Sequence, residues 1–330
     1  MLRLLGAWMV AAGVLGLAAC SGPQSALEPA GQGAERIAAL FWWMTAGALL
    51  IWAFVVSLTI YAIRIRPEAH RQNVGVWLIV GGGAVLPTLV LAGLLSYGLA
   101  LMPELLHRAP ENSLQITVSG EQWWWRIHYR MPSGAGTVEL ANEIRLPVGE
   151  RVSFLLESPD VIHSFWIPSL GGKIDMIPGR TNRLTLEPTR TGVFRGVCAE
   201  YCGTSHALMN FDVVVLEKAD FTAWLNRQQT IAQPPTQPLA IRGQELFITN
   251  GCGACHTVRG TPADGVIGPD LTHVGSRLSL GAGVLPNDPE AFLTWMARTE
   301  EVKPGVHMPH FGMLPPEDLR DLAAYLDTLE

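Results

Sequence analysis

Two long apolar segments, residues 37–63 and 74–102, restrict this chain more than any other feature of its 330 residues. Neither segment contains His, Asp, Glu, Lys or Arg. At about 1.5 Å of rise per residue, each is long enough as a helix to cross a hydrocarbon core about 30 Å thick. The sequence therefore predicts a transmembrane hairpin. Because it lacks ionisable groups, we expect no proton relay inside it.

The loop between the two apolar segments is basic. It contains Arg64, Arg66 and Arg71. Because cytoplasmic loops of membrane proteins are enriched in Lys and Arg, we expect this loop on the cytoplasmic side and both outer ends of the hairpin outside. The parts of the chain beyond residue 109 are therefore predicted on the periplasmic, outer side of a bacterial plasma membrane.

The first 20 residues have the pattern of an export signal. Arg3 is followed by an apolar run that ends L-A-A-C at Cys20, an ending similar to a bacterial lipobox. We expect residues 1–19 to be a lipoprotein signal peptide, with Cys20 lipidated after cleavage. Residues 20–109 then form the N-terminal segment and the hairpin. An uncleaved signal or a third membrane helix is the alternative, although the run is short for a membrane span.

Side chains that suit copper are concentrated in the run C-A-E-Y-C-G-T-S-H-A-L-M, residues 198–209. Its metal-type ligands are Cys198, Cys202, His206 and Met209. Soft sulfur together with imidazole is the donor set that copper prefers, and V-I-H-S-F-W upstream offers a second imidazole, His163. A disulfide between the two cysteines is the alternative, since it is the default for an isolated C-x-x-x-C in an exported protein.

Short segments rich in Val, Ile, Thr and Phe follow one another between residues 113 and 217, separated by Gly and Pro turns. The clearest of them are residues 114–118, 151–156, 183–186 and 211–216. Many short strands at this spacing predict a β-sandwich or barrel. We assign residues 110–228 to this domain, with a short closing helix over residues 221–229.

Several of these stretches resemble subunit II of the haem-copper cytochrome c oxidases. The resemblance covers residues 35–220 and is carried by G-E-Q-W-W-W-R-I-H-Y from Gly120, by D-V-I-H-S-F-W-I-P-S-L-G-G-K-I-D-M-I-P-G-R from Asp160, and by the Cys198 segment. It implies an all-β cupredoxin-like Greek-key barrel with a binuclear copper centre, CuA, on loops at one end. It also implies that oxygen is reduced in a partner chain, subunit I.

The resemblance implies six copper ligands. Cys198 and Cys202 would supply the two bridging thiolates, and His163 and His206 the two terminal imidazoles. Met209 would supply a weak thioether ligand, and Glu200 its backbone carbonyl. No copper ligand of the family pattern is missing.

Two further roles follow from the resemblance. The family places the tryptophan through which electrons enter at the first position of W-W-W, which is Trp123; a core aromatic is the alternative. The carboxylate of Glu200 resembles the family's ligand to a magnesium ion at the interface with subunit I. The alternative is a solvent-exposed loop glutamate, which the sequence alone does not distinguish from such a ligand. The chain departs from some members at the start of the second helix, where it has Val74 instead of a glutamate, with Glu68 and His70 nearby.

The chain beyond residue 228 starts with a Pro-rich stretch, A-Q-P-P-T-Q-P-L, which predicts a linker over residues 229–240. About twelve extended residues at ~3.1 Å each reach somewhat under ~40 Å. Such a linker is expected to tether the next domain, residues 241–330, without fixing its pose.

The C-terminal domain carries a haem-attachment signature. Cys252, Cys255 and His256 form C-x-x-C-H, whose spacing allows two thioether bonds to the haem vinyl groups while the imidazole reaches the iron. A zinc or redox C-x-x-C is the alternative, but no second metal-type cysteine pair follows in the sequence.

This domain resembles a small, all-α class I cytochrome c. The resemblance implies that Pro269, in G-P-D-L, lies near the axial imidazole, and that Arg277 pairs with a haem propionate. It also makes Met308, in M-P, the sixth iron ligand; its rivals on sequence alone are Met313, His307 and His310. Residues 315–329 are expected to form an amphipathic closing helix.

The charge of the chain is concentrated in this last domain. The chain has a net charge of −6, and residues 241–330 hold 6 Lys and Arg against 12 Asp and Glu, which leaves 17 of each elsewhere. An acidic cytochrome c domain predicts a basic surface on the electron donor, so that turnover falls as salt rises.

These features together predict the subunit through which electrons enter a caa3-type haem-copper oxidase. A donor would reduce haem c, electrons would pass to CuA and then to subunit I, and oxygen would become water with proton pumping. The expected partners are subunits I and III, cytochrome c or another respiratory donor, and membrane lipid, with no nucleic acid. The alternatives are a CuA-containing nitric oxide reductase and a membrane-anchored electron carrier. A quinol oxidase subunit is disfavoured, because its copper ligands are typically missing.

Overall fold

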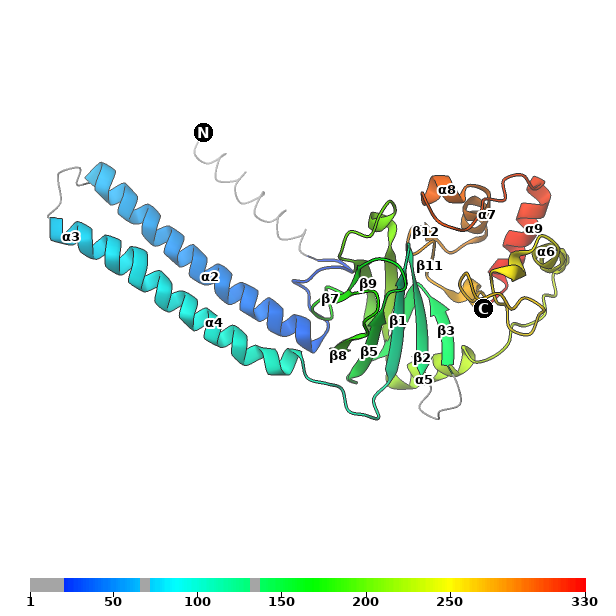
Figure 1. The fold of residues 1–330 in the computed structure, drawn as a ribbon, viewed down its shortest axis with the longest axis horizontal. Coiled ribbons are helices and arrows are strands. Elements are labelled where there is room, and N and C mark those ends of the chain that lie inside the picture. The colour runs from blue at the N-terminus through cyan, green and yellow to red at the C-terminus, as the bar shows by residue number, and fades with distance from the viewer. Residues whose placement is uncertain (1–20, 66–71, 131–136) are drawn as a thin grey trace, which may run out of the picture. The chain divides into compact units, whose positions relative to one another are not determined.

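The fold was analysed in a computed structural model, which describes residues 21–65, 72–130 and 137–330 (Figure 1). The expected signal peptide, Cys20, and the loop residues Arg66, Glu68, His70 and Arg71 lie outside the described residues. The chain divides into two compact units, residues 36–108 and the remainder.

The first of these units is a pair of long apolar helices. One helix is α2 (Gln32–Ile60), extended by a π-helical segment over Tyr61–Ile65. The other runs through α3 (Gln72–Trp77), a π-helical segment over Leu78–Val85 and α4 (Leu86–Leu105). Both are long and apolar enough to cross a membrane. The prediction of two apolar N-terminal helices is confirmed, and each expected segment lies within one of them.

The β-domain consists of two five-stranded sheets. The strands of the first, in spatial order, are β3 (Thr137–Ala141), β2 (Trp124–Arg130), β1 (Gln115–Glu121), β5 (Val152–Glu157) and β8 (Asn182–Leu186). The strands of the second are β4 (Glu143–Pro147), β10 (Asn210–Leu216), β9 (Gly192–Cys198), β6 (His163–Trp166) and β7 (Ile174–Met176). Parallel pairs, β1 with β5 and β4 with β10, occur beside antiparallel ones. The predicted cupredoxin-like fold is confirmed.

Alternating side chains of these strands fill the space between the two sheets. In β1 every second residue is buried, as period-2 patterning requires. The centre of the core is aromatic: Phe165 stacks on Phe211, and Trp125 contacts both rings edge-on. The helix α5 (Lys218–Arg227) closes the domain and buries Phe221 and Trp224. The metal-type loop is therefore supported by this core, and Cys198, Cys202 and Met209 are buried as part of it.

The C-terminal domain is helical. Its main helices are α6 (Pro238–Thr249), α7 (Pro289–Ala297), α8 (Thr299–Val302) and α9 (Pro316–Asp327), joined by short turns and a hairpin of β11 (Ser279–Leu280) and β12 (Leu285–Pro286). Helices α6 and α9 cross closely at Gly243, where a Cβ atom would lie 2.0 Å from the carbonyl oxygen of Asp321. The amphipathic helix expected over residues 315–329 corresponds to α9. It buries Leu319, Leu322, Ala323 and Leu326, and Leu329 is buried just beyond its end.

Candidate copper and haem sites

The copper-type residues come together at one end of the second sheet. Cys198 is the last residue of β9, and the loop from Ala199 to Met209 returns the chain to β10. His163 is the first residue of β6, which pairs with β9 so that Phe165 lies opposite Cys198. Strand pairing therefore brings His163 next to a loop 35 residues away.

Sulfur and nitrogen atoms surround one small space in this loop. Sγ of Cys198 lies 3.8 Å from Sγ of Cys202 and 3.8 Å from Nδ1 of His163. Sγ of Cys202 lies 3.5 Å from Nδ1 of His206 and 3.8 Å from Sδ of Met209. Both cysteines are free, and their sulfur separation is far beyond the ~2.05 Å of a disulfide. The structure thus brings together every predicted ligand side chain of this site.

The sixth predicted ligand atom, a carbonyl oxygen, is also present. Sγ of Cys198 lies 3.2 Å from the backbone oxygen of Glu200, whereas the Glu200 side chain is exposed. The set of two thiols, two imidazoles, a thioether and a carbonyl suits copper, because soft sulfur and imidazole together favour it.

The site favours the ionised form of one of its two sulfur atoms, that of Cys198. Hydrogen bonding with Cys202, followed by contacts with His163 and backbone groups, lowers the pKa of Cys198 to about 3. The same pairing raises the pKa of Cys202. Burial by itself lowers the pKa of His163, but its hydrogen bonds to Cys198 and Asp160 outweigh burial and raise it. Thiolates are the form in which cysteines bind metal.

Asp160 has a positioning role that the sequence analysis left out. Nε2 of the fully buried His163 donates to its Oδ1 at 2.9 Å, which leaves Nδ1 facing Cys198. Oδ2 of Asp160 accepts from the backbone of Gln122 at 2.7 Å. A carboxylate that holds the far nitrogen of a ligand imidazole fixes both its tautomer and its orientation. The signal was the D-x-x-H spacing.

Trp123 lies beside the copper loop and is only 7% exposed. Its Nε1 donates to the carbonyl oxygen of Cys202 at 3.0 Å. Two glycines make room for its ring: a Cβ atom on Gly203 would lie 3.0 Å from Cζ2, and one on Gly305 would lie 2.9 Å from Cζ3. Because Gly203 belongs to the copper loop and Gly305 to the segment before Met308, the indole fills the space between them.

The C-x-x-C-H residues form one tight turn. Gly251, at φ +77°, precedes the 3₁₀ turn Cys252–Ala254, and the backbone nitrogen of His256 donates to the carbonyl of Cys252 at 3.0 Å. Nδ1 of His256 donates to the carbonyl oxygen of Pro269 at 2.8 Å. Nε2 is therefore the nitrogen available to a metal. Pro269 lies beside the imidazole, as expected. Burial, chiefly, lowers the pKa of His256 and favours the neutral ligand form.

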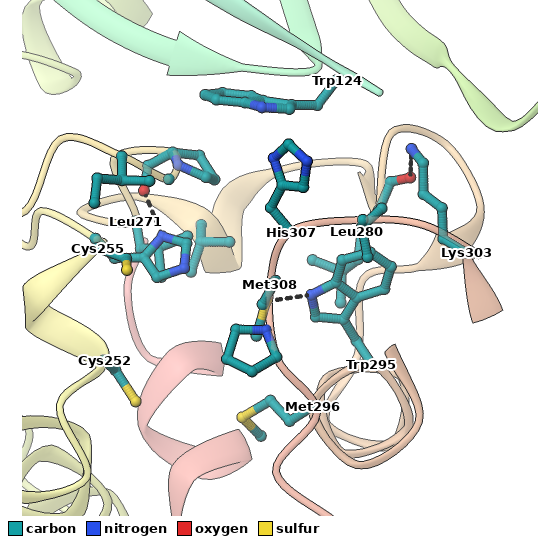
Figure 2. Close-up of a pocket in the computed structure, with 18 of the residues that line it drawn as sticks. Trp124, Cys252, Cys255, Leu271, Leu280, Trp295, Met296, Lys303, His307 and Met308 are labelled. Carbon is teal, nitrogen blue, oxygen red and sulfur yellow. Dashed lines mark hydrogen bonds between the residues drawn. The ribbon is translucent and has the colours of Figure 1, made fainter. Parts of the chain in front are cut away.

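These residues line a cavity of about 680 Å³ (Figure 2). Met308 lies among its lining residues, and Nε1 of Trp295 approaches its Sδ at 3.2 Å. Figure 2 shows His307 lying beneath Trp124 at the edge of the cavity, whereas Met313 is 69% exposed. The geometry therefore favours Met308 over Met313 as the partner of His256. Trp295 had no signal in the sequence, because only folding places it beside Met308.

Arg277 also lines the cavity. Its Nη2 donates to the carbonyl oxygen of Asp270 at 2.5 Å. Burial lowers its pKa, against the raising effect of Asp270 and nearby glutamates. A guanidinium held in this environment suits an anionic group in the cavity, such as a propionate.

The residues of both sites suit the cofactors that the sequence predicts. The thiol, imidazole and carbonyl atoms crowd one point, as a metal centre requires. The cavity is apolar, with two thiols and an imidazole on one segment and a thioether and a cation on others. This is the donor set of a covalently attached haem.

Comparison with known proteins agrees with both sites. Residues 130–217 match the family of the periplasmic domain of cytochrome c oxidase subunit II, and residues 240–330 match the cytochrome c family. The chain is 40% identical over 220 residues to cytochrome c oxidase subunit 2 of Alkalihalophilus pseudofirmus, over 67% of this chain and 62% of that one. It is 35% identical over 231 residues to the corresponding protein of Bacillus sp. strain PS3, over 67% and 63%.

A solved structure adds a more limited likeness. The periplasmic domain of subunit II of cytochrome oxidase from Bradyrhizobium japonicum is 32% identical, with a TM-score of 0.34, over 37% of this chain and 97% of that one. The chain spans somewhat less than two thirds of the length of the two bacterial relatives described above. Both family matches fall on the domains that carry the two sites. The chain therefore belongs to the cytochrome c oxidase subunit II family and continues, after its copper-type domain, into a cytochrome c domain.

Proposed function

We propose that this chain is the subunit through which electrons enter a haem-copper oxidase that reduces oxygen to water. The observation that carries the proposal is the gathering of six copper-type ligand atoms in the same compact unit as a haem-sized cavity. Electrons would enter through the cytochrome c domain and leave through the copper-type domain.

The copper-type domain would hold a binuclear copper centre. Its ligands would be Cys198, Cys202, His163, His206, Met209 and the carbonyl of Glu200. When bound, such a centre and a haem each supply one-electron oxidation and reduction. Asp160 keeps the imidazole of His163 in place, and the rigid barrel keeps the ligand atoms fixed between the two oxidation states. Fixed ligands favour fast electron transfer, because little structural rearrangement accompanies it.

The C-terminal domain would hold haem c. Cys252 and Cys255 would bond to the vinyl groups, and His256 and Met308 would ligate the iron. Pro269 orients the imidazole, and Arg277 would face a propionate. Trp123, packed between the Cys202 loop and Gly305, is the residue proposed to receive electrons on the copper side.

The remaining partners are assigned by the same proposal. Subunit I would receive the electrons and hold the oxygen-reducing site, with subunit III beside it, and proton pumping would belong to that assembly. Glu200, whose side chain is exposed beside the copper loop, would offer its carboxylate to magnesium at the subunit I interface. A respiratory cytochrome or similar donor would reduce the haem. The apolar helices would anchor the chain in a bacterial plasma membrane with both soluble domains outside, and Cys20 would carry lipid.

The proposal is tested on the native complex purified through this chain. We expect two copper ions that share one unpaired electron, one covalent haem c, additional a-type haem in a partner and cyanide-sensitive oxygen uptake. If the partner instead holds b-type haem with non-haem iron and reduces nitric oxide, the chain serves a nitric oxide reductase. If the chain is purified with both cofactors but without a catalytic partner, it is a membrane-anchored electron carrier.

A further inference from the structure

Three charged side chains form one row on the outer face of the second sheet. Strand register places Asp212 of β10 opposite Arg195 of β9 on one side and opposite Glu143 of β4 on the other. Their neighbours along these strands, such as Phe211 and Val213, point into the core. Side chains that alternate away from the core of a barrel normally face water.

These outward side chains are nevertheless covered. Glu143 is 6% and Asp212 is 9% exposed, although burying a carboxylate without partners is costly. Glu143 has one partner on its own strand, Nε of Arg145 at 2.8 Å. The other partners come from the cytochrome c domain: the backbone nitrogen of Leu278 donates to Oε2 of Glu143 at 2.7 Å, and the hydroxyl of Ser279 donates to Asp212. Both donors lie at the start of the β11–β12 hairpin.

The tip of the same hairpin makes the complementary contacts. Nη2 of Arg195 donates to the carbonyl oxygen of Gly283 at 2.8 Å, and the backbone nitrogen of Asn210 donates to the carbonyl oxygen of Ala282 at 3.2 Å. Ala282 is fully buried at φ +67°, a left-handed conformation that is uncommon for a residue with a side chain. From the other side, Nζ of Lys303 supports the tip by donating to Gly281 at 2.8 Å.

We propose that the β11–β12 hairpin is a docking element that locks the cytochrome c domain onto the Arg195, Asp212 and Glu143 row of the copper-type domain. The linker is itself bonded to the cytochrome c domain through the backbone of Thr230 and Ala232, and the row and the hairpin add the contacts that hold this domain on the second sheet. This inference deepens the proposed function, because a fixed pose holds the haem cavity against Trp123. The docking contacts themselves can be tested without reference to electron transfer.

The test compares Ser279→Asp with the exchanged pair Ser279→Asp and Asp212→Ser in the full chain. The single variant sets two carboxylates against each other, and like charges across an interface cost enough to undock it. Amide hydrogen exchange should then speed up at Leu278 and Asn210 by about tenfold or more, a factor that corresponds to a modest free-energy change. The double variant restores one hydroxyl and one carboxylate, and should restore most of the protection. Thr249→Asp, on the exposed side of α6, is the matched control.

Two further measurements keep the outcome decisive. An unchanged haem spectrum and unchanged exchange in α6 and α9 show that the cytochrome c domain remains folded. If Ser279→Asp disturbs them, Arg195→Met removes the bond to Gly283 from the copper-type domain instead, and should raise exchange at Leu278 about fivefold, as expected for one hydrogen bond. Unchanged exchange at both amides in folded variants would overturn the proposal. Loss of docking with intact copper and haem content would leave the proposed function standing.

Discussion

The copper-type site and the haem cavity arrange their ligands in opposite ways. The copper-type ligands crowd one point at the edge of the barrel, and Cys198, Cys202 and Met209 belong to the same buried cluster as its aromatic residues. The haem ligands line a space of about 680 Å³ whose walls include the apolar core of the domain itself, among them Phe247, Phe292 and Leu326. The copper-type site is therefore already packed by the protein's own side chains, whereas the haem site contains a large space that the haem would fill.

Removing the haem cysteines should have the largest effect. Without the haem, an apolar space of about 680 Å³ stays unfilled, and apolar side chains that lose their packing partners destabilise a fold. We expect Cys252→Ala with Cys255→Ala to unfold residues 238–330. Limited proteolysis and amide exchange should show this loss while the β-domain stays protected.

The matched variant removes the copper-type cysteines instead. Cys198→Ala with Cys202→Ala should abolish copper binding and leave the β-domain protected to nearly its normal extent. Equal loss of protection in both double variants would contradict the contrast between the two sites.

Changing the axial thioether should have a smaller effect, confined to the haem. Met308→Ala should abolish the sulfur-to-iron absorption band of the oxidised haem and lower its reduction potential, because methionine ligation raises that potential. Met313→Ala is the control, since its side chain is 69% exposed. A band that survives in Met308→Ala and disappears in Met313→Ala would reverse the assignment.

Trp123 tests the connection between the two sites. Trp123→Gln should slow reduction of the copper by about tenfold or more, the size of change expected when a well-placed group is displaced, while the copper spectrum stays intact. Trp166→Gln is the control, because its indole also donates to a backbone carbonyl, that of Gly171. Loss of the copper spectrum in Trp123→Gln would instead assign the residue to the core.

The last expected effect is confined to the pH dependence of stability and concerns Lys303, which is 1% exposed. Burial lowers its pKa to about 7, below the ~10.4 of an unfolded lysine. Between these values the unfolded chain binds more protons, so the free energy of unfolding should rise with pH, by up to about 1.4 kcal/mol per unit. Lys303→Met should flatten this rise in denaturation curves between pH 7 and 10, and Lys218→Met, at an exposed site, should not. A slope unchanged in Lys303→Met would show that the lysine is not buried in its neutral form.

The two sites were predictable from the sequence because most of their ligand residues are close together along the chain. Cys198, Cys202, His206 and Met209 share one loop, and Cys252, Cys255 and His256 share one turn, so residue types and spacing could predict both sites. The alternation of the strands and the 3.6-residue period of α9 were likewise local signals. The resemblance to known oxidases supplied the role of His163, which strand pairing then placed beside Cys198.

Features that depend on tertiary packing were beyond the reach of the sequence. Trp295 approaches Met308, and Lys303 supports the hairpin tip, only because helices and loops from distant segments meet there. The charged row of Arg195, Asp212 and Glu143 reads in the sequence as an ordinary solvated face. Only the strand register and the covering hairpin show that it is an interface.

The polar character of that row has a consequence for the order of assembly. Had this part of the contact also been apolar, each domain would expose a larger apolar surface while it waited for its cofactor. A row of charged groups is instead well hydrated until the hairpin arrives, so the β-domain can fold, stay soluble and receive its metal first. The cytochrome c domain can then mature on its own schedule and attach afterwards, which makes cofactor delivery to the two halves of one polypeptide independent.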